Sequence, residues 1–253
     1  MKYSYVLLTI ILSLSFLTHS ASYNSLKNRQ EDMISNLFDQ LVQKQINTNF
    51  SIERSVNALL KSYPEQIDIV LKVALAKYPL EYRQIMCGAL RAEPALASDI
   101  ITILLQSNIA DSTDIISIAL DEEPAYATEI VNTALLYYPE QLENIVRVAI
   151  LIEPVMAKNV VNDTMKSYPE KLLEILVIAV KAFPDQVANT VRDTLRLSVD
   201  SSEVISVAVR SSHKEKTREI ITTAIKSGVS EELATAAAIV GGAKPSDIVK
   251  LSL

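Results

Sequence analysis

The 253-residue chain has no tryptophan, one cysteine, two histidines and four glycines. A single cysteine, Cys87, cannot form a disulfide within the chain, which excludes a disulfide-stabilised scaffold. A zinc site needs several Cys, His or carboxylate ligands at set spacings, and no such cluster occurs. The four glycines form no phosphate-binding loop. These absences predict a protein that holds neither a metal nor a cofactor.

Catalytic residues are equally scarce. Beyond residue 21 the only histidine is His213, and no second histidine exists to complete a nucleophilic dyad with Cys87. Cys87 is therefore interpreted as a partly buried small residue. His213 lies among Lys and Arg residues and is interpreted as part of a solvated turn between helices. The acidic run at 121–123 could serve as acid and base, but the positions equivalent to Asp121 and Glu122 in the other repeats are not acidic. We therefore predict that the protein is not an enzyme.

The charge of the chain disfavours nucleic acid as a partner. Lysine and arginine number 24 against 30 acidic residues, a formal net charge of −6. Binding to phosphates requires clustered basic residues that neutralise charge. We expect no nucleic acid partner.

The first 21 residues have the pattern of a cleaved export signal. Lys2 precedes an apolar run from Tyr5 to Leu17, and small and polar residues follow as far as Ala21. The apolar run is short for a membrane span, although an uncleaved anchor is the alternative. The sequence thus predicts a periplasmic or extracellular protein with no stable membrane span in the mature chain.

The prolines reveal an internal repeat. Eight of the nine fall on one fifteen-residue spacing, with Ile109 at the single vacant position; they are Pro64, Pro79, Pro94, Pro124, Pro139, Pro154, Pro169 and Pro184. Proline lacks an N–H group and fits the first turn of a helix, where that donor has no helical partner. The residue before proline is disfavoured in the α conformation, so each helix ends just short of the next proline. The spacing predicts units of one helix with about 11–12 helical residues each.

Apolar residues recur in fixed columns after each proline. In the unit that begins at Pro139, for example, the columns hold Ile145, Val146, Ala149 and Ile150. This spacing of i, i+3, i+4, i+7 and i+8 forms one stripe of a helix and breaks the alternation of a strand. No unit can bury such a stripe alone, so neighbouring units must stack.

A thirty-residue period lies within the fifteen-residue one. Glu93, Glu123 and Glu153 precede alternate prolines, whereas Tyr78, Tyr138 and Tyr168 precede prolines of the intervening set. Two kinds of helix that alternate predict an all-α fold, an α-solenoid of 15-residue single-helix units that pair into 30-residue hairpins. The units share the helical-hairpin organisation of TPR and HEAT arrays, but they lack the TPR consensus and are shorter than HEAT units. The sequence indicates no specific family.

The periodicity also predicts the domain organisation. After a signal peptide at 1–21, residues 22–48 are expected to form a polar lead and an N-terminal capping helix, with a helical face from Glu31 to Lys44. The repeat array is assigned to 49–197. The register slips by one residue near Ser198, and 198–253 are assigned to degenerate repeats and a C-terminal cap. Ser230 is expected to cap the last long helix, with Gly228 before it and Gly241 and Gly242 after it as helix stops.

Two copies of the sequence S-x-x-E flank prolines. They pair Ser62 with Glu65 and Ser167 with Glu170. The spacing predicts capping boxes, in which each side chain accepts a hydrogen bond from the other residue's backbone N–H.

The aromatic residues before prolines are the only candidate binding residues. They occupy equivalent helix boundaries and comprise Tyr63, Tyr78, Tyr138, Tyr168 and Phe183. A stacked ridge of such rings could bind a partner peptide or glycan. Alternatively, each ring packs over a neighbouring turn as a structural staple. A ridge requires the rings to line one open edge, whereas staples lie flat under the next turn; we expect partial burial, with the phenolic oxygens in contact with water.

Three functions are compatible with these features. The first is an exported, non-enzymatic scaffold that binds an unknown protein or peptide, since solenoid faces are extended and the chain has no evident reaction centre. The second is a structural envelope or matrix component that self-associates through outer apolar residues such as Leu136, Tyr137, Leu151 and Ile152. An enzyme is the third.

Overall fold

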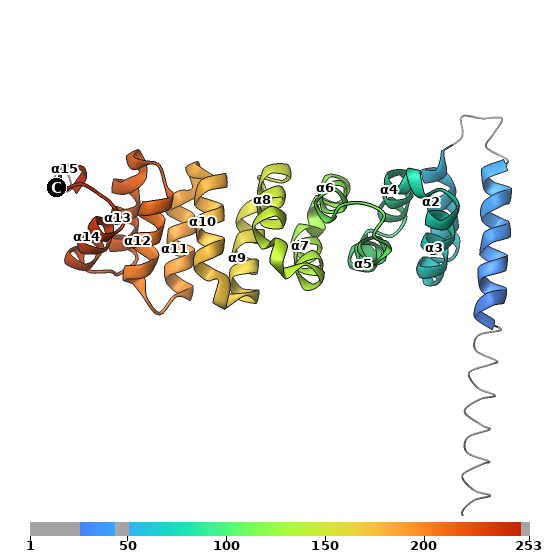
Figure 1. The fold of residues 1–253 in the computed structure, drawn as a ribbon, viewed down its shortest axis with the longest axis horizontal. Helices are drawn as coiled ribbons and strands as arrows, with labels where there is room; N and C mark the ends of the chain where they lie inside the picture. The colour runs from blue at the N-terminus through green and yellow to red at the C-terminus, as the bar shows by residue number, and fades with distance from the viewer. Residues whose placement is uncertain (1–25, 44–50, 249–253) are drawn as a thin grey trace, which may run out of the picture. The chain divides into compact units, whose positions relative to one another are not determined.

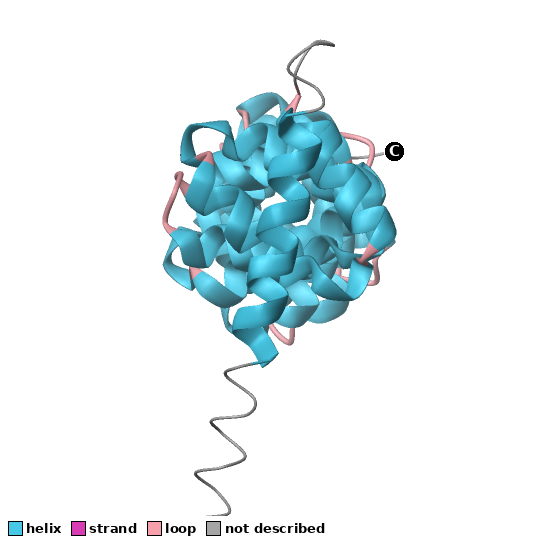
Figure 2. Cartoon of the chain, turned by 90° about the vertical axis from the view of Figure 1, so that its right-hand side faces the viewer, coloured by secondary structure: helices cyan, strands magenta, loops and turns pink. Residues whose placement is uncertain are grey.

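The computed structural model describes residues 26–43 and 51–248, which form helices joined by short turns with no strand among them (Figure 2). The predicted all-α repeat fold is confirmed. The predicted export signal at 1–21 lies outside the described residues. The chain divides into two compact units, Met1–Glu93 and Pro94–Leu253, which are considered separately.

The described part of unit 1 starts with a helix over residues 26–43, which starts five residues before the predicted helical face. Three helices of 11 residues and two short 3-10 turns follow; they are α2 (Ile52–Ser62), η1 (Pro64–Gln66), α3 (Ile67–Lys77), η2 (Pro79–Glu81) and α4 (Tyr82–Ala92). The first helix covers the end of α3, where Phe38 packs edge-on against Tyr78 with ring centroids 5.9 Å apart. Asp39 and Lys77 form an ion pair at 2.6 Å beside these rings.

Helices α2 and α4 approach each other closely because of Gly88. A Cβ atom at this position would collide with the carbonyl oxygen of Glu53 on α2. The Asn57 side-chain amide donates a hydrogen bond to the Gly88 carbonyl at 3.2 Å. A larger side chain at position 88 would force the two helices apart.

Unit 2 continues the same arrangement for the rest of the described chain (Figure 1). Its elements are η3 (Pro94–Leu96), α5 (Ala97–Ser107), α6 (Ser112–Glu122), η4 (Pro124–Tyr126), α7 (Ala127–Tyr137), η5 (Pro139–Gln141), α8 (Leu142–Ile152), α9 (Ala157–Ser167), η6 (Pro169–Lys171), α10 (Leu172–Ala182), η7 (Pro184–Gln186), α11 (Val187–Leu197), α12 (Ser201–Ser211), η8 (Lys214–Lys216), α13 (Thr217–Lys226), α14 (Glu231–Val240) and α15 (Pro245–Ile248). The helices from α5 to α12 each contain 11 residues, as the spacing predicts.

The predicted apolar columns form the core. In α8, Ile145, Val146 and Ala149 have no exposed surface and Ile150 is 2% exposed. The equivalent residues of α6 are buried to the same extent. Burial of apolar surface contributes about 25 cal/mol per Å², so these columns are the main stabilising feature of each unit.

Each proline turn repeats the same backbone geometry. The residue before proline has φ between −121° and −141° and ψ between 62° and 71°. Its N–H closes the preceding helix, as in the 2.9 Å bond from Tyr138 to the Ala134 carbonyl. Its carbonyl then accepts from the second residue after proline, as in the 3.0 Å bond from Gln141 to Tyr138. The turn thus satisfies its own backbone groups.

The predicted capping boxes are wrong. Ser62 is the last residue of α2, and its hydroxyl donates back to the Ala58 carbonyl at 2.9 Å. Tyr63 and Tyr168 are the residues that precede the 3-10 turns, and neither turn has a side-chain cap. Proline moves the boundary to its immediate neighbour, so a serine two residues before proline still belongs to the previous helix.

Two layers of helices make up unit 2, and each consists of alternate helices. The odd layer contains α5, α7, α9, α11 and α13, and the even layer contains α6, α8, α10, α12 and α14. Each helix packs on the next helix of its own layer and on its chain neighbours. Side-chain bonds therefore link residues about thirty apart: Thr133 to Ser98 at 3.1 Å, Ser112 to Gln141 at 2.5 Å and Asn162 to Asp193 at 3.2 Å. The predicted thirty-residue hairpin is confirmed.

The C-terminal part of unit 2 departs from the regular spacing. Helix α12 begins at Ser201, one residue early, and α13 returns to the regular spacing at Thr217. The Ser230 hydroxyl caps α14 by accepting from the Leu233 N–H at 3.2 Å, as predicted. Gly228 and Gly242 follow α13 and α14 with φ of 97° and 104°. These left-handed conformations favour glycine and end the two helices.

Helix lengths also bear on the relation to a membrane. Throughout the described ranges, no helix combines the length and the apolar character needed to cross a bilayer.

Candidate functional site

The five predicted aromatic residues are all half-buried, and each lies at the end of a helix. Consecutive helices run in opposite directions, so helix ends alternate between two edges of the stack (Figure 1). In unit 2, Tyr138 and Tyr168 end two odd-layer helices, whereas Phe183 ends an even-layer helix and lies at the opposite edge. In unit 1, Tyr63 and Tyr78 end consecutive helices and are separated in the same way. Only residues thirty apart share an edge, and the five rings form no single ridge.

Several of these rings contact neighbouring elements. The Tyr78 ring meets Phe38 of the first helix. The Tyr138 hydroxyl donates to the Leu105 carbonyl at the end of α5, at 3.3 Å, and so links two odd-layer helices. Burial raises the pKa of the Tyr168 hydroxyl above its ordinary value, and the nearby Glu170 carboxylate raises it further. The contacts of Tyr78 and Tyr138 give these two rings structural roles.

A polar groove lies at the turn that lacks proline, between α5 and α6. It has a volume of about 580 Å³, and its lining comprises Asn108, Ile109, Ala110, Asp111, Ser112, Thr113, Tyr138, Gln141 and Asn144. Asn108 has φ 51°, a left-handed conformation that replaces the proline turn. The Ser112 hydroxyl is already used, because it donates to the Gln141 side chain. The groove is open and mostly polar, unlike the apolar, enclosed pockets that hold small molecules.

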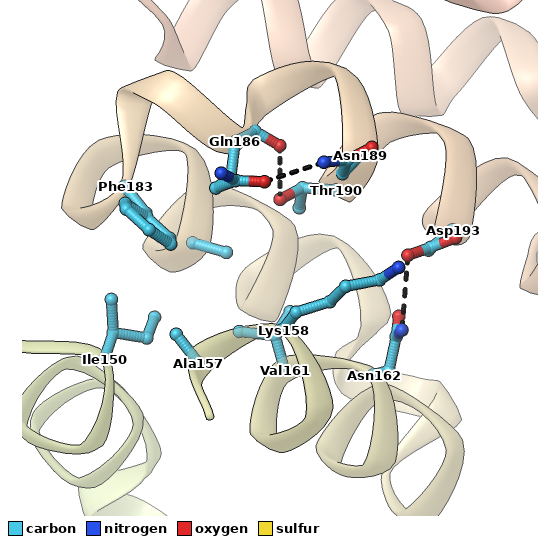
Figure 3. Close-up of a pocket in the computed structure, with 11 residues that line it drawn as sticks. Ile150, Ala157, Lys158, Val161, Asn162, Phe183, Gln186, Asn189, Thr190 and Asp193 are labelled. Carbon is cyan, nitrogen blue, oxygen red and sulfur yellow. Dashed lines mark hydrogen bonds between the residues drawn. The ribbon is translucent and has the colours of Figure 1, made fainter. Parts of the chain in front are cut away.

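A second site, here called the Phe183 crevice, lies between α9 and α11 of the odd layer (Figure 3). Its apolar lining consists of Ile150, Ala157, Val161, Ala179 and Phe183. Its polar lining consists of Lys158, Asn162, Gln186, Asn189, Thr190 and Asp193. The crevice therefore combines apolar side chains from three helices with amide, hydroxyl and charged groups from α9, η7 and α11.

Hydrogen bonds hold the polar side of the crevice in place. The Asn189 amide donates to the Gln186 side-chain oxygen at 2.7 Å, and the Thr190 hydroxyl donates to the Gln186 backbone carbonyl at 3.1 Å (Figure 3). Across the crevice, the Asn162 amide donates to Asp193 at 3.2 Å. The Asp193 side chain is only 14% exposed and also lies 3.7 Å from Arg196. These bonds orient the amide groups of the rim before any partner arrives.

Asparagines recur along the odd layer at the thirty-residue spacing. Asn132 and Asn162 occupy one column on α7 and α9, and Asn159 and Asn189 occupy another on α9 and α11. The Asn132 side-chain oxygen is buried and accepts no hydrogen bond from any of the described residues. Sequence reasoning missed these columns because it compared residues thirty apart only beside the prolines. The same comparison within the helices would have revealed them.

The size of the crevice limits its chemistry. Its enclosed volume is about 20 Å³. This holds about one water molecule or the tip of one side chain, since a water needs at least about 10–15 Å³, whereas small-molecule pockets occupy about 300–1,000 Å³. The crevice fits an anchoring side chain rather than a cofactor.

The residues with potential for catalysis or metal binding are dispersed. Cys87 is half-buried on α4, and His213 is exposed at the start of η8. Within residues 26–43 and 51–248, no three His, Cys, Asp or Glu side chains are grouped as a metal ion would need.

Comparisons with known proteins add no relative to these observations. No protein-family model matches the chain, and neither the curated proteins nor the solved structures contain a significant match to it.

Proposed function

We propose that the protein is an exported, non-enzymatic scaffold that binds an extended polypeptide along the odd layer of unit 2, with the Phe183 crevice as the anchor point. The observation that carries this proposal is the combination of an apolar crevice with oriented amide groups on repeated helices. A binding face of this kind needs no reaction centre.

The chemistry of the rim suits a polypeptide backbone. An Asn or Gln side chain offers an N–H donor and a carbonyl acceptor, the same pair that each peptide group presents. Asn159 and Asn189 repeat this pair at equivalent positions of α9 and α11, so an extended chain can bond to both in succession. One small apolar side chain of the partner enters the crevice between Ala157 and Phe183. Such a buried anchor with a polar rim is the usual composition of a protein interface.

Export is supported by the sequence of the first 21 residues. N-terminal sequencing of the native protein should begin near Ser22. Recovery of an intact Met1 from a soluble cytoplasmic fraction would contradict this part of the proposal.

The binding face is tested with peptides selected from a random display library against the purified protein. Replacing Gln186 and Asn189 together with alanine is expected to weaken the selected peptides at least tenfold, because about 1.4 kcal/mol is lost with the amide contacts. Lys171 and Glu174 provide a matched control, since they form an equally spaced pair on η6 and α10 with a 2.9 Å bond. Their double alanine variant should bind as the unaltered protein does.

Hydrogen exchange provides a second measurement on the same complexes. Bound peptide should slow exchange in α9 and α11, whereas α6, an even-layer helix that contributes no residue to the crevice, should remain unchanged. Equal loss of binding in both double variants, or protection confined to the even layer, would contradict the proposal.

Self-association is a second candidate function, supported by apolar side chains on the surface of unit 2. Leu136 is 75% exposed, Leu151 is 62% exposed and Tyr137 is 39% exposed, while Ile152 is half-buried. Leu136 and Leu151 end helices of different layers and so lie at opposite edges. A structural polymer built through these edges should grow continuously with concentration in light-scattering measurements, whereas a scaffold should not.

A further inference from the structure

Helix α14 is the last helix of the even layer (Figure 1), and among the described residues no further helix of that layer covers its outer, apolar face. Its buried side, Ala234, Ala237 and Ala238, packs on α12 and α13. The opposite side exposes Leu233 by 43%, Ile239 by 49% and Val240 by 71%, with Ala236 exposed between them. Helix α15 packs on α13. In contrast, each earlier even-layer helix is covered by the next helix of that layer.

The charges around this face suit a second copy of α14 in the antiparallel direction. Glu231 and Glu232 are exposed at the start of the helix, and Lys244 is exposed just beyond its end. An antiparallel partner brings the lysine of each copy toward the two glutamates of the other. The positive helix start of one copy also lies beside the negative helix end of the other, which is favourable.

The spacing of the apolar residues agrees with this symmetry. Leu233 and Val240 lie nearly equally far on either side of Ala236. A two-fold axis beside Ala236 therefore sets Leu233 of one copy against Ile239 and Val240 of the other, with small alanines at the crossing where the helices come closest.

We propose that α14 mediates an isologous, antiparallel dimer of this protein through Leu233, Ala236, Ile239 and Val240. The dimer continues the even layer across the two-fold axis and closes the stack. Its contact is one ten-residue helix per copy, at the low end of the size range of specific interfaces, below about 1,200 Å² in total. The association is consequently weak and reversible. Each dimer contains two copies of the proposed polypeptide-binding site, one in each protomer.

The test is sedimentation velocity on the purified protein from about 1 to 500 µM, a range chosen for weak interfaces of this size. The unaltered protein is expected to shift reversibly from monomer to dimer. Ile239→Glu should remain a monomer with unchanged helicity and melting temperature, because this side chain is exposed in the monomer. Leu151→Glu, which removes a similarly exposed residue far from α14, is the matched control and should dimerise normally.

Two further sets of variants establish the geometry. Reversing either charge, by Glu232→Lys or Lys244→Glu, should weaken dimerisation, and the combined variant should restore it. In a Cys87→Ser background, Ala236→Cys should form a disulfide between copies under mild oxidation, whereas Leu151→Cys should not.

Three results overturn the proposal. One is a monomer across the whole concentration range. Another is growth beyond the dimer, which indicates head-to-tail or edge contacts. The third is dimerisation that appears only after residues 249–253 are removed, because the chain's own C-terminal segment then covers α14.

Discussion

In unit 2, the proline turns and the proline-free turn between α5 and α6 connect helices in different ways, yet the helices themselves are the same. At Tyr138-Pro139 the chain uses a residue with φ −132° and ψ 62° followed by a 3-10 turn, and α8 follows with 11 residues. At Asn108-Ile109 it uses a left-handed residue and no 3-10 turn, and α6 also has 11 residues. Helix α6 begins at Ser112, fifteen residues after α5 begins at Ala97. The period therefore persists without proline, so packing of the apolar columns sets it and proline only shapes the turn.

The largest effect is expected from shifting an apolar column. One residue inserted between Leu142 and Glu143 in α8 rotates Ile145, Val146 and Ala149 by about 100° out of the core. We expect a loss of more than about 4 kcal/mol, measured by urea unfolding. An insertion between Ile152 and Glu153, at the turn, should cost about 1–2 kcal/mol because loops absorb extra residues. Equal losses in the two variants would show that the columns do not set the period.

Single substitutions of two glycines, one at a helix contact and one in a turn, also compare helix packing with turn geometry. Gly88→Ala should cost about 3 kcal/mol, the upper range for overpacking, because the new Cβ collides with the Glu53 backbone and α2 must move away from α4. Gly228→Ala should cost about 1 kcal/mol from its left-handed backbone, with no atom within 4 Å of the new Cβ. Thermal unfolding of both variants measures the difference. A larger loss of stability for Gly228→Ala would indicate that turn geometry contributes more to stability than helix packing does.

Exchanging the two turn types should have a smaller effect. Pro139→Ala is expected to cost about 1 kcal/mol, because the unfolded chain gains conformational freedom. Ile109→Pro alone should also destabilise the fold, because Asn108 would then precede a proline, and its left-handed conformation is disfavoured at that position. Adding Asn108→Tyr should recover stability to within about 0.5–1 kcal/mol of the original by creating a proline turn. Failure of the second substitution to recover any stability would contradict interchangeable turns.

The smallest effect concerns the pH dependence of one proline turn. The folded-state pKa of Tyr168 lies above its ordinary value because of burial, so folding favours the neutral hydroxyl. This contribution is fully present below about pH 10 and is lost as the pH rises through the folded-state pKa. Tyr168→Phe should remove this part of the alkaline decline in stability, measured by urea unfolding between pH 8.5 and 11.5. Identical pH profiles for the two proteins would contradict it.

Local signals in the sequence were sufficient for the helices of unit 2. The columns at Ile145 and Val146 and the prolines at fifteen-residue intervals predicted helix position, length and buried face. The Ser230 cap and the Gly228 and Gly242 stops were also predictable, because each depends only on residues within a few positions. The S-x-x-E prediction at Ser62 failed because it ignored how proline moves the helix boundary to Tyr63.

The candidate sites bring together residues that are close in space but far apart in the sequence. Tyr138 and Phe183 look equivalent when compared at each proline, but the antiparallel hairpin places them at opposite edges. The Phe183 crevice joins Asn162 to Asp193 and adds Ile150 from a third helix, and no local pattern places these residues together.

The sequence by itself determined that the chain is a stack of short helices, because proline geometry and apolar periodicity act over one or two helical turns. Only the tertiary structure decided which surfaces remain open, namely the rim of the crevice and the outer face of α14. A side chain's exposure depends on the helix that packs over it, and in this fold that helix lies thirty residues away along the chain.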